Sequence, residues 1–226
     1  MRKCAIIKKG DSLKQQVYAL YQKMFQKMGP QGWWPADSKE EIILGAILVQ
    51  NTNWQNAAIS LKNLKAVTGF SSSQIASLSI ENLQELIRPS GFFKSKSQAI
   101  HEIFTWLIPF NSNFLKVKNY YGKSLRKKLL SFHGIGEETA DVLLLYVFDV
   151  SVFVADTYAR RLFTQLGTPE LHNYQSLKKL VDLSRFTLVE AQEFHGLIDE
   201  FGKVFLKRNT FETSFLNDEK INLRQE

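Results

Sequence analysis

The stretch from residue 129 to residue 144 reads LLSFHGIGEETADVLL. Apolar residues recur at helical spacing on both sides of a short segment that contains Gly134 and Gly136. Glycine has no Cβ, so it permits a positive φ and lets a foreign backbone come close. The helix after such a turn presents free backbone N–H groups, which suit a phosphate. The stretch predicts a helix, a tight turn and a second helix, although a Gly-x-Gly turn alone is more often a plain connection.

A second pattern follows at residues 154–162, which read VADTYARRL. Here Asp156 comes after a short apolar run, residues 150–154, and directly precedes a helical segment. An aspartate in that place is a common helix N-cap, because its carboxylate accepts the free N–H groups of the first turn. Taken alone, Asp156 therefore predicts a cap.

The rest of the chain has helical periodicity and little strand-like alternation, which predicts an all-α fold. The expected helices span 11–28, 37–49, 54–67, 72–78, 81–88, 95–108, 112–117, 122–131, 157–166, 174–183 and 187–207. We expect one domain of two packed helical lobes. Lobe A covers about 30–136, and lobe B combines the N-terminal segment 1–29 with 137–226.

Composition limits the cofactors and partners. The formal charge of +7 favours a polyanionic partner, although a basic surface that only keeps the protein in solution explains it equally well. Cys4 is the only cysteine, which excludes an iron-sulfur cluster or a cysteine-based zinc site. The histidines do not have metal-ligand spacing, so we expect no metal and no cofactor; they are His101, His133, His172 and His195. With no secretory segment or membrane span in the sequence, a cytoplasmic, nucleoid-associated monomer is expected.

Together, the glycine turn and the later aspartate resemble the helix-hairpin-helix of endonuclease III-like DNA glycosylases. The resemblance implies that Gly134 and Gly136 form the hairpin, that Thr139 opens the second helix and that Asp156 is the catalytic carboxylate. Capping and catalysis are compatible roles. Bifunctional relatives carry a nucleophilic lysine two residues after the second hairpin glycine, where this chain has Glu138. A carboxylate cannot form the imine, so the implied chemistry is monofunctional, with water replacing the base.

The N-terminal part narrows the resemblance. Residues 32–35 read GWWP and residues 44–54 read LGAILVQNTNW, similar to the endonuclease III-like 3-methyladenine DNA glycosylase subfamily over about residues 25–205. The subfamily implies a pocket in which a methylated purine stacks on indole faces. The implied pocket residues are Trp33, Trp34, Pro35, Trp54, Glu138 and Lys203. Core packing is the alternative role for the tryptophans, and the chain departs from a known relative at Leu197, which replaces a lysine.

Flipping a base out of a duplex requires a side chain to fill the space it leaves. The resemblance gives this wedge role to Gln50, beside Asn51. Residues 89–96 read PSGFFKSK and supply a second candidate, with Phe92 for stacking and with Lys94 and Lys96 for phosphate contacts. Packing of Phe92 and Phe93 under the next helix is equally compatible with the sequence.

The sequence thus predicts a monofunctional DNA N-glycosylase that removes alkylated purines, chiefly 3-methyladenine and in addition 7-methylguanine, from damaged double-stranded DNA. Two alternatives stay open. One is an abasic-site lyase or a glycosylase for other lesions, which could use a different lysine such as Lys203. The other is a helix-hairpin-helix protein that binds DNA without chemistry.

Overall fold

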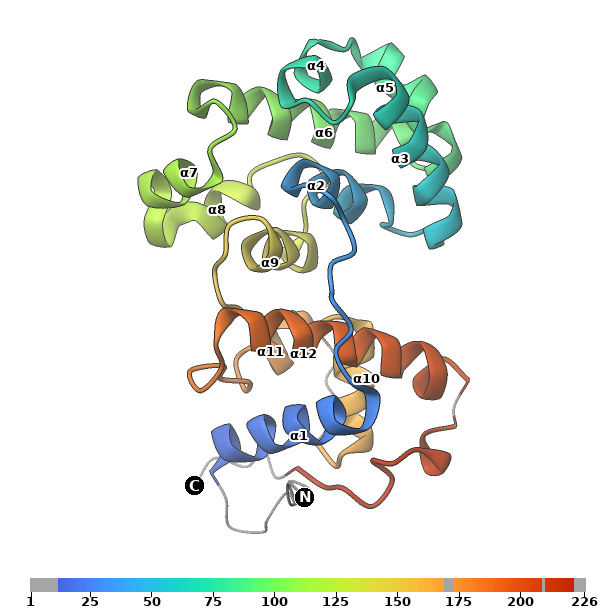
Figure 1. Ribbon diagram of the computed structural model, residues 1–226, viewed down its shortest axis with the longest axis vertical. Coiled ribbons are helices and arrows are strands. Elements are labelled where there is room, and N and C mark those ends of the chain that lie inside the picture. The colour runs from blue at the N-terminus through green and yellow to red at the C-terminus, as the bar shows by residue number, and fades with distance from the viewer. Residues whose placement is uncertain (1–11, 169–172, 209, 222–226) are drawn as a thin grey trace. The chain divides into compact units, whose positions relative to one another are not determined.

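The computed structural model describes residues 12–168, 173–208 and 210–221, and every regular element in these ranges is helical (Figure 1). This confirms the all-α prediction. Cys4 and His172 lie outside the described residues. The α-helices are α1 (Leu13–Met28), α2 (Lys39–Leu48), α3 (Trp54–Thr68), α4 (Ser72–Ser77), α5 (Ile80–Ile87), α6 (Phe93–Leu107), α7 (Phe114–Tyr121), α8 (Leu125–Leu129), α9 (Glu137–Tyr146), α10 (Thr157–Gln165), α11 (Tyr174–Lys178) and α12 (Leu188–Phe201). Short helical turns lie at η1 (Arg88–Ser90), η2 (Ile108–Phe110), η3 (Gly122–Ser124), η4 (Gly202–Leu206) and η5 (Phe211–Thr213).

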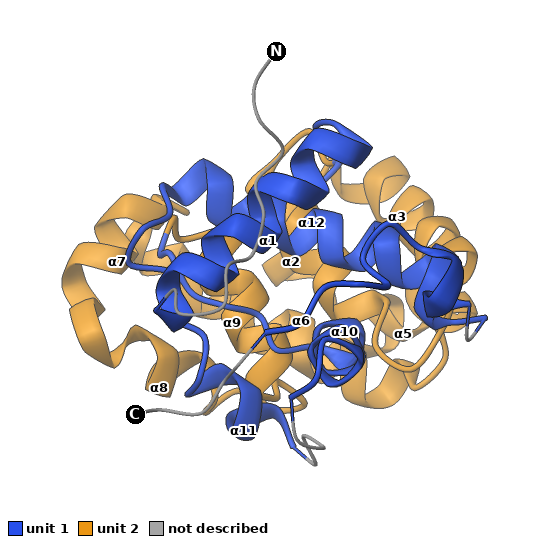
Figure 2. Cartoon of the chain, turned by 90° about the horizontal axis from the view of Figure 1, so that it is seen from below, with its two compact units in different colours: residues 1–35, 150–226 blue, residues 36–149 orange. Residues whose placement is uncertain are grey.

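The chain divides into two compact units, shown in different colours in Figure 2. Unit 1 comprises residues 1–35 and 150–226, and unit 2 comprises residues 36–149. The division falls later than the lobe limits at 29/30 and 136/137 that the sequence suggested. Helix α9 accounts for the shift of the second limit, because it packs on α2 and is bonded to α8, both of which belong to unit 2.

Unit 2 is built around α2, which contacts α3, α6 and α9. Its sequence from Ile42 to Leu48 is apolar all round and entirely buried, as expected for a helix in the middle of a core. The helix begins at Ser38, whose hydroxyl accepts the N–H of Glu41 at 3.1 Å.

Unit 1 is built on α12, which contacts α1 and α10. A Thr187–Glu190 capping box starts α12. Its inner face includes Phe194, whose ring lies 5.9 Å from Tyr21 of α1 and 5.5 Å from Phe186. At Gly202 the helix passes into the single π-helical turn η4. A Cβ at Gly202 would overlap the ring of Tyr158, so glycine lets α10 approach this turn closely.

Several helix boundaries differ from the prediction, and two of the differences have a local explanation. Helix α7 begins at Phe114 and not at 112, because Asn111 and Ser112 have φ values of 52°. Helix α11 ends at Lys178 and not at 183. The carboxylate of Asp182 accepts the N–H of Ser184 at 2.7 Å, which offers the backbone a turn in place of a helix.

Candidate active site and nucleic-acid interface

The predicted hairpin connects α8 and α9 in unit 2. Gly134 has a φ of 68°, and a Cβ there would lie 3.2 Å from Ser95 Oγ, so this position requires glycine. Gly136 has a φ of −85°, which any residue adopts, and nothing lies within 4 Å of a Cβ built there. The expected positive φ therefore occurs at Gly134 only, while the open space at Gly136 leaves room for an external backbone.

Side chains from three helices brace the hairpin. The guanidinium of Arg126 on α8 donates to both carboxylate oxygens of Asp141 on α9, at 2.8 and 3.1 Å. Two further bonds come from α6: Glu102 accepts the backbone N–H of His133 at 2.8 Å, and Ser95 Oγ lies 3.1 Å from His133 Nε2. The turn is therefore held from the flanking helices and from α6.

Gln50 lies against this hairpin. Its side-chain amide donates to Thr139 Oγ1 at 2.9 Å and to the carbonyl of Gly134 at 3.4 Å. The structure thus brings together Gln50, Gly134 and Thr139, three residues predicted to contact DNA. The neighbouring Asn51 is exposed, with a φ of 52°.

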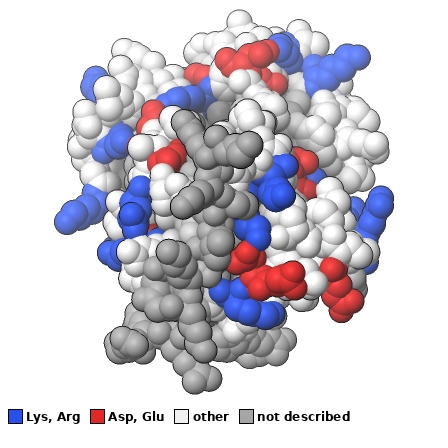
Figure 3. Space-filling model, turned by 60° about the horizontal axis from the view of Figure 1, so that its bottom comes forward, with Lys and Arg blue, Asp and Glu red and all other residues white. Residues whose placement is uncertain are grey.

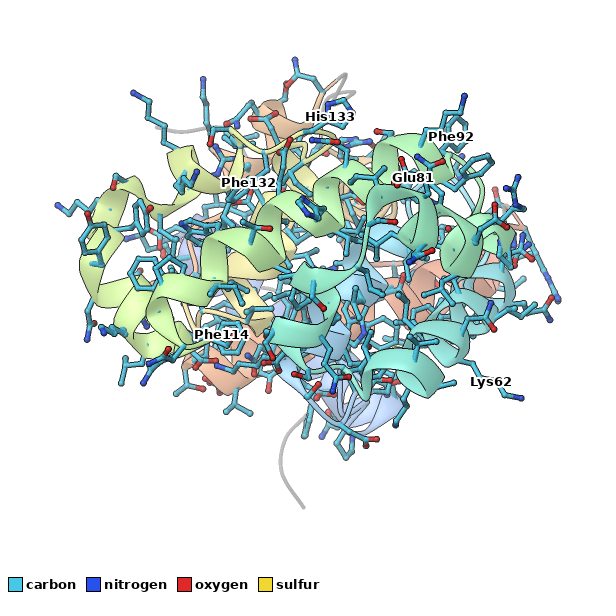
Figure 4. The ribbon with its side chains drawn as sticks, turned by 90° about the horizontal axis from the view of Figure 1, so that it is seen from above. Lys62, Glu81, Phe92, Phe114, Phe132 and His133 are labelled. Carbon is cyan, nitrogen blue, oxygen red and sulfur yellow. The ribbon has the colours of Figure 1, made fainter. Side chains whose placement is uncertain are left out.

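Within the 89–96 segment, the connection before α6 ends at an exposed aromatic side chain. Phe92 is 67% exposed and has a φ of 47°, whereas Phe93 lies under the guanidinium of Arg88, 4.6 Å from its ring centroid. Phe92 therefore does not pack under the helix, while Phe93 is half-buried beneath Arg88. In Figure 4, Phe92 and His133 lie at the same edge of unit 2. Lys94 is exposed next to Phe92.

Lys96 does not have the phosphate-binding role that the sequence suggested. The residue is 2% exposed, and its ammonium donates to the carbonyls of Leu48 and Ser90 at 2.8 and 2.7 Å. Burial lowers its pKa to about 8. A phosphate cannot reach this group, so the prediction for Lys96 was wrong. Helical spacing was the available signal, because Lys96 shares a face with the buried Ile100 and Ile103 of α6.

Two of the predicted pocket residues belong to unit 2. Trp54 is the first residue of α3 and is 45% exposed. The helix is capped by Asn53, whose side chain accepts the N–H of Asn56 at 2.9 Å. Glu138 is exposed in the first turn of α9.

Asp156 belongs to unit 1 and caps α10. One carboxylate oxygen accepts the N–H of Ala159 at 2.6 Å, so the capping role read from the sequence is confirmed. The residue is 9% exposed, and its other carboxylate oxygen lies 3.9 Å from His195 Nε2. A carboxylate held in a fixed orientation by its cap is suited to act on a positively charged centre.

His195 on α12 is a neighbour of Asp156 that the sequence did not indicate. Its side chain is buried, and burial together with the charge of Lys203 lowers its pKa to about 4. The imidazole is therefore neutral near pH 7, and its contact with Asp156 is not an ion pair. One histidine within an amphipathic helix carries no sequence signal for such a contact.

Among the other predicted pocket residues of unit 1, Trp33 packs on α12 and Lys203 lies in η4, which follows α12. A Cβ at Gly196 would lie only 2.5 Å from the Cβ of Trp33, so glycine at this position lets the tryptophan lie directly against the helix. The Trp33 ring contacts Trp34 at a centroid distance of 5.7 Å, and Pro35 is exposed beyond them. Lys203 lies over the Trp33 ring, with its ammonium 4.8 Å from the centroid.

Lys203 is held by two carboxylates, Asp199 and Glu200, each 2.7 Å from its ammonium. Burial acts to lower the pKa of Lys203, but the bonds to these carboxylates outweigh it, so the pKa is raised. The amine stays protonated near neutral pH.

On the side of the molecule drawn in Figure 3, charge does not single out a binding face. On the face drawn in Figure 3, Lys and Arg side chains are interspersed with Asp and Glu. The described residues contain no cluster of three or more His, Cys, Asp and Glu that could hold a metal ion. Among the described helices, none is long and apolar enough to cross a membrane.

Three comparisons with known proteins agree with this geometry. Residues 44–197 match the HhH-GPD superfamily of base excision DNA repair proteins. MJ1434 of Methanocaldococcus jannaschii, a protein assigned to the DNA repair glycosylases, is 34% identical over 85% of this chain and 89% of its own length. The H. pylori 3-methyladenine DNA glycosylase MagIII, solved with 1,N6-ethenoadenine, is 29% identical over 84% of this chain and 97% of its own, with a TM-score of 0.68. A non-covalent endonuclease III–DNA complex shares the fold, with a TM-score of 0.62 at 20% identity over 84% of this chain and 86% of that one.

Proposed function

Because the chain belongs to the HhH-GPD superfamily of base excision DNA repair proteins, we propose that it is a monofunctional DNA glycosylase for alkylated purines, chiefly 3-methyladenine and in addition 7-methylguanine. The single observation that carries the proposal is the buried carboxylate of Asp156 at the start of α10. The likeness to an H. pylori protein named as a 3-methyladenine DNA glycosylase, over nearly all of that protein, supports the choice of substrate.

The proposed reaction is hydrolysis of the N-glycosidic bond. The bond between the purine nitrogen and C1′ breaks, and its electron pair leaves with the base. A cationic methylated purine becomes neutral on departure, so it needs no proton from an acid. The negative charge of Asp156 stabilises the positive charge that develops on the sugar. As water bonds to C1′, its proton passes to the carboxylate and then to solvent.

The state of Lys203 supports hydrolysis over lyase chemistry. An amine attacks a sugar only when it is deprotonated, and catalytic lysines therefore have lowered pKa values. The pKa of Lys203 is raised, and its ammonium is bonded to Asp199 and Glu200. Glu138, at the place of the family's nucleophilic lysine, cannot form an imine. Neither residue is suited to cleave the strand.

Each unit has its own part in the proposal. In unit 1, Trp33, Trp34, Pro35 and Lys203 are assigned to the damaged base, with Asp156 on the sugar. In unit 2, the family resemblance assigns Trp54 and Glu138 to the base. An indole face attracts a methylated purine by dispersion and by cation–π interaction.

The DNA backbone is assigned to the hairpin of unit 2, with Gly134, Gly136 and Thr139, together with Asn51 and Lys94. The exposed Phe92 is suited to fill the space that the flipped base leaves, because an apolar side chain inserts between stacked bases. Gln50 would share this wedge role by giving up its bond to Thr139. We expect the enzyme to act on double-stranded DNA as a monomer.

Product analysis tests the proposal. Duplex DNA that contains 3-methyladenine or 7-methylguanine is incubated with the protein. Free base is quantified, and strand breaks are measured before and after alkali treatment of the DNA. We expect free base together with strand breaks that appear only after alkali. Nicking without alkali, together with borohydride trapping of the protein on DNA, would show lyase chemistry instead. Intact DNA binding with neither product would show a binding protein without catalysis.

A further inference from the structure

Lys96 is a buried cation whose partners are main-chain carbonyls. In the described part of the chain its ammonium forms no ion pair with a carboxylate, and its two bonds go to Leu48 and Ser90. Taking an ammonium out of water is costly, and leaving two buried carbonyls without donors would be costly too. The two hydrogen bonds to main-chain carbonyls are therefore the main contribution of Lys96 to the fold.

The two carbonyls belong to two different segments of unit 2, each two positions before a proposed wedge residue. Leu48 is the last residue of α2, two positions before Gln50. Ser90 closes η1, two positions before Phe92. Lys96 itself lies in the first turn of α6, where its backbone N–H donates to the carbonyl of Phe92 at 3.0 Å. One side chain therefore bonds the segments that lead to both proposed wedge residues.

Both loops contain a residue in the left-handed region. Asn51 has a φ of 52° and Phe92 a φ of 47°. Asparagine visits this region readily, whereas a bulky aromatic residue does so only when the surrounding structure holds it there. Because Phe92 is 67% exposed, packing of its own ring is a weak constraint. The side-chain bond of Lys96 to Ser90 adds a constraint to the helical bond between the Lys96 N–H and the Phe92 carbonyl.

We propose that Lys96 is a positioning residue that ties the 49–53 loop to the 88–92 loop, so that Gln50 and Phe92 enter the DNA as one rigid wedge. The role rests on the proposed function, because it presupposes a base that is flipped. In this role Lys96 touches no DNA. Its effect on excision comes from the spacing of two loops that do.

The tie itself is tested in the free protein by hydrogen exchange. The reporters are the amides of Thr52 and Gly91, which donate to Val49 and Arg88 at 3.3 and 3.1 Å. Lys96→Met keeps the length of the side chain but removes its donors, and we expect both amides to exchange at least tenfold faster. Lys96→Arg keeps charge and donors and should restore at least half of the protection. Unchanged exchange at both amides in Lys96→Met would overturn the tie.

The wedge role is tested with 2-aminopurine placed beside the lesion, whose fluorescence rises when stacking is lost. We expect Lys96→Met to reduce this rise and the excision rate at least tenfold, while affinity for undamaged duplex stays within twofold. Leu83→Ala, which truncates a fully buried side chain of α5, is the control for lost stability, and per folded molecule it should behave like wild type. A wild-type fluorescence rise in Lys96→Met would overturn the positioning role. Absence of any rise in the wild-type protein would instead overturn the proposed function, and the exchange result would still decide the tie.

Discussion

Gly196→Ala adds one methyl group at the point where Trp33 lies on α12. The new Cβ would stand 2.5 Å from the Cβ and 3.0 Å from the Cγ of Trp33. Carbon atoms in favourable contact are about 3.5–4.0 Å apart. The tryptophan must therefore retreat by about 1 Å, because the helix backbone is the stiffer partner.

The expected effects on stability and on activity differ in size. Overpacking of this kind destabilises the fold by about 1–3 kcal/mol, but alanine in place of glycine inside a helix stabilises it by about 1 kcal/mol. The net loss in free energy of unfolding should be about 2 kcal/mol at most. Displacement of a substrate-positioning group by about 1 Å costs on the order of 100-fold in rate. We therefore expect excision to fall far more than stability.

Single-turnover release of 3-methyladenine and denaturant unfolding, measured on the same preparations, provide the assay. Leu177→Ala is the matched control, because it truncates a fully buried side chain of α11 in the same unit. It should lose more stability, about 2–5 kcal/mol, yet keep the wild-type rate per folded molecule. If Gly196→Ala excises base at the wild-type rate, Trp33 does not position the base and the reasoning fails.

Three further predictions follow from individual side chains. His195 has a folded pKa of about 4 against an ordinary value of 6.5, so its stabilising contribution is present above pH 6.5 and is lost as the pH falls towards 4. Between pH 7 and pH 5 the free energy of unfolding should fall by about 2 kcal/mol from this cause, which urea titrations would show. If His195→Gln had the same pH dependence as wild type, His195 would not be the cause. Trp54→Ala should slow excision at least tenfold while duplex affinity changes less than threefold, and equal losses in both measurements would argue against a place in the base pocket. Lys94→Ala should reduce the slope of log K against log salt by about 0.9 without altering the single-turnover rate at saturation, and an unaltered slope would remove Lys94 from the phosphate contacts.

The parts of the fold that were predictable depend on short-range patterns. The order of the helices followed from apolar periodicity and caps, as with Ser38 before α2 and Asp156 before α10. Boundaries failed where a side chain offered the backbone an alternative bond, as Asp182 does after α11. The limit between the units differs from the expected lobe limit at α9, because the packing of α9 on α2 and the Arg126–Asp141 bond are long-range contacts.

In the candidate site too, local patterns were predictable and long-range contacts were not. Motif spacing located the hairpin glycines and Asp156, since both belong to local patterns. It could not show that Lys96 turns inward or that His195 approaches Asp156, because each depends on residues far away in the sequence. The sequence shows Gly196 as a glycine inside a helical pattern. Glycine is required there because of the contact with Trp33, which lies more than 160 positions away in the sequence. Long-range contacts of this kind leave no trace in a single sequence.

Asp156→Asn tests the catalytic assignment most directly, because it removes the charge but keeps the side-chain oxygen that caps α10. The measurement is single-turnover release of 3-methyladenine from duplex DNA by wild type and variant, with affinity for abasic DNA determined in parallel. We expect release to fall by at least about 1000-fold, as for loss of a principal electrostatic group, while abasic-DNA affinity stays within a few-fold. Release at a rate comparable to that of the wild type would contradict the assignment of Asp156 as the catalytic carboxylate.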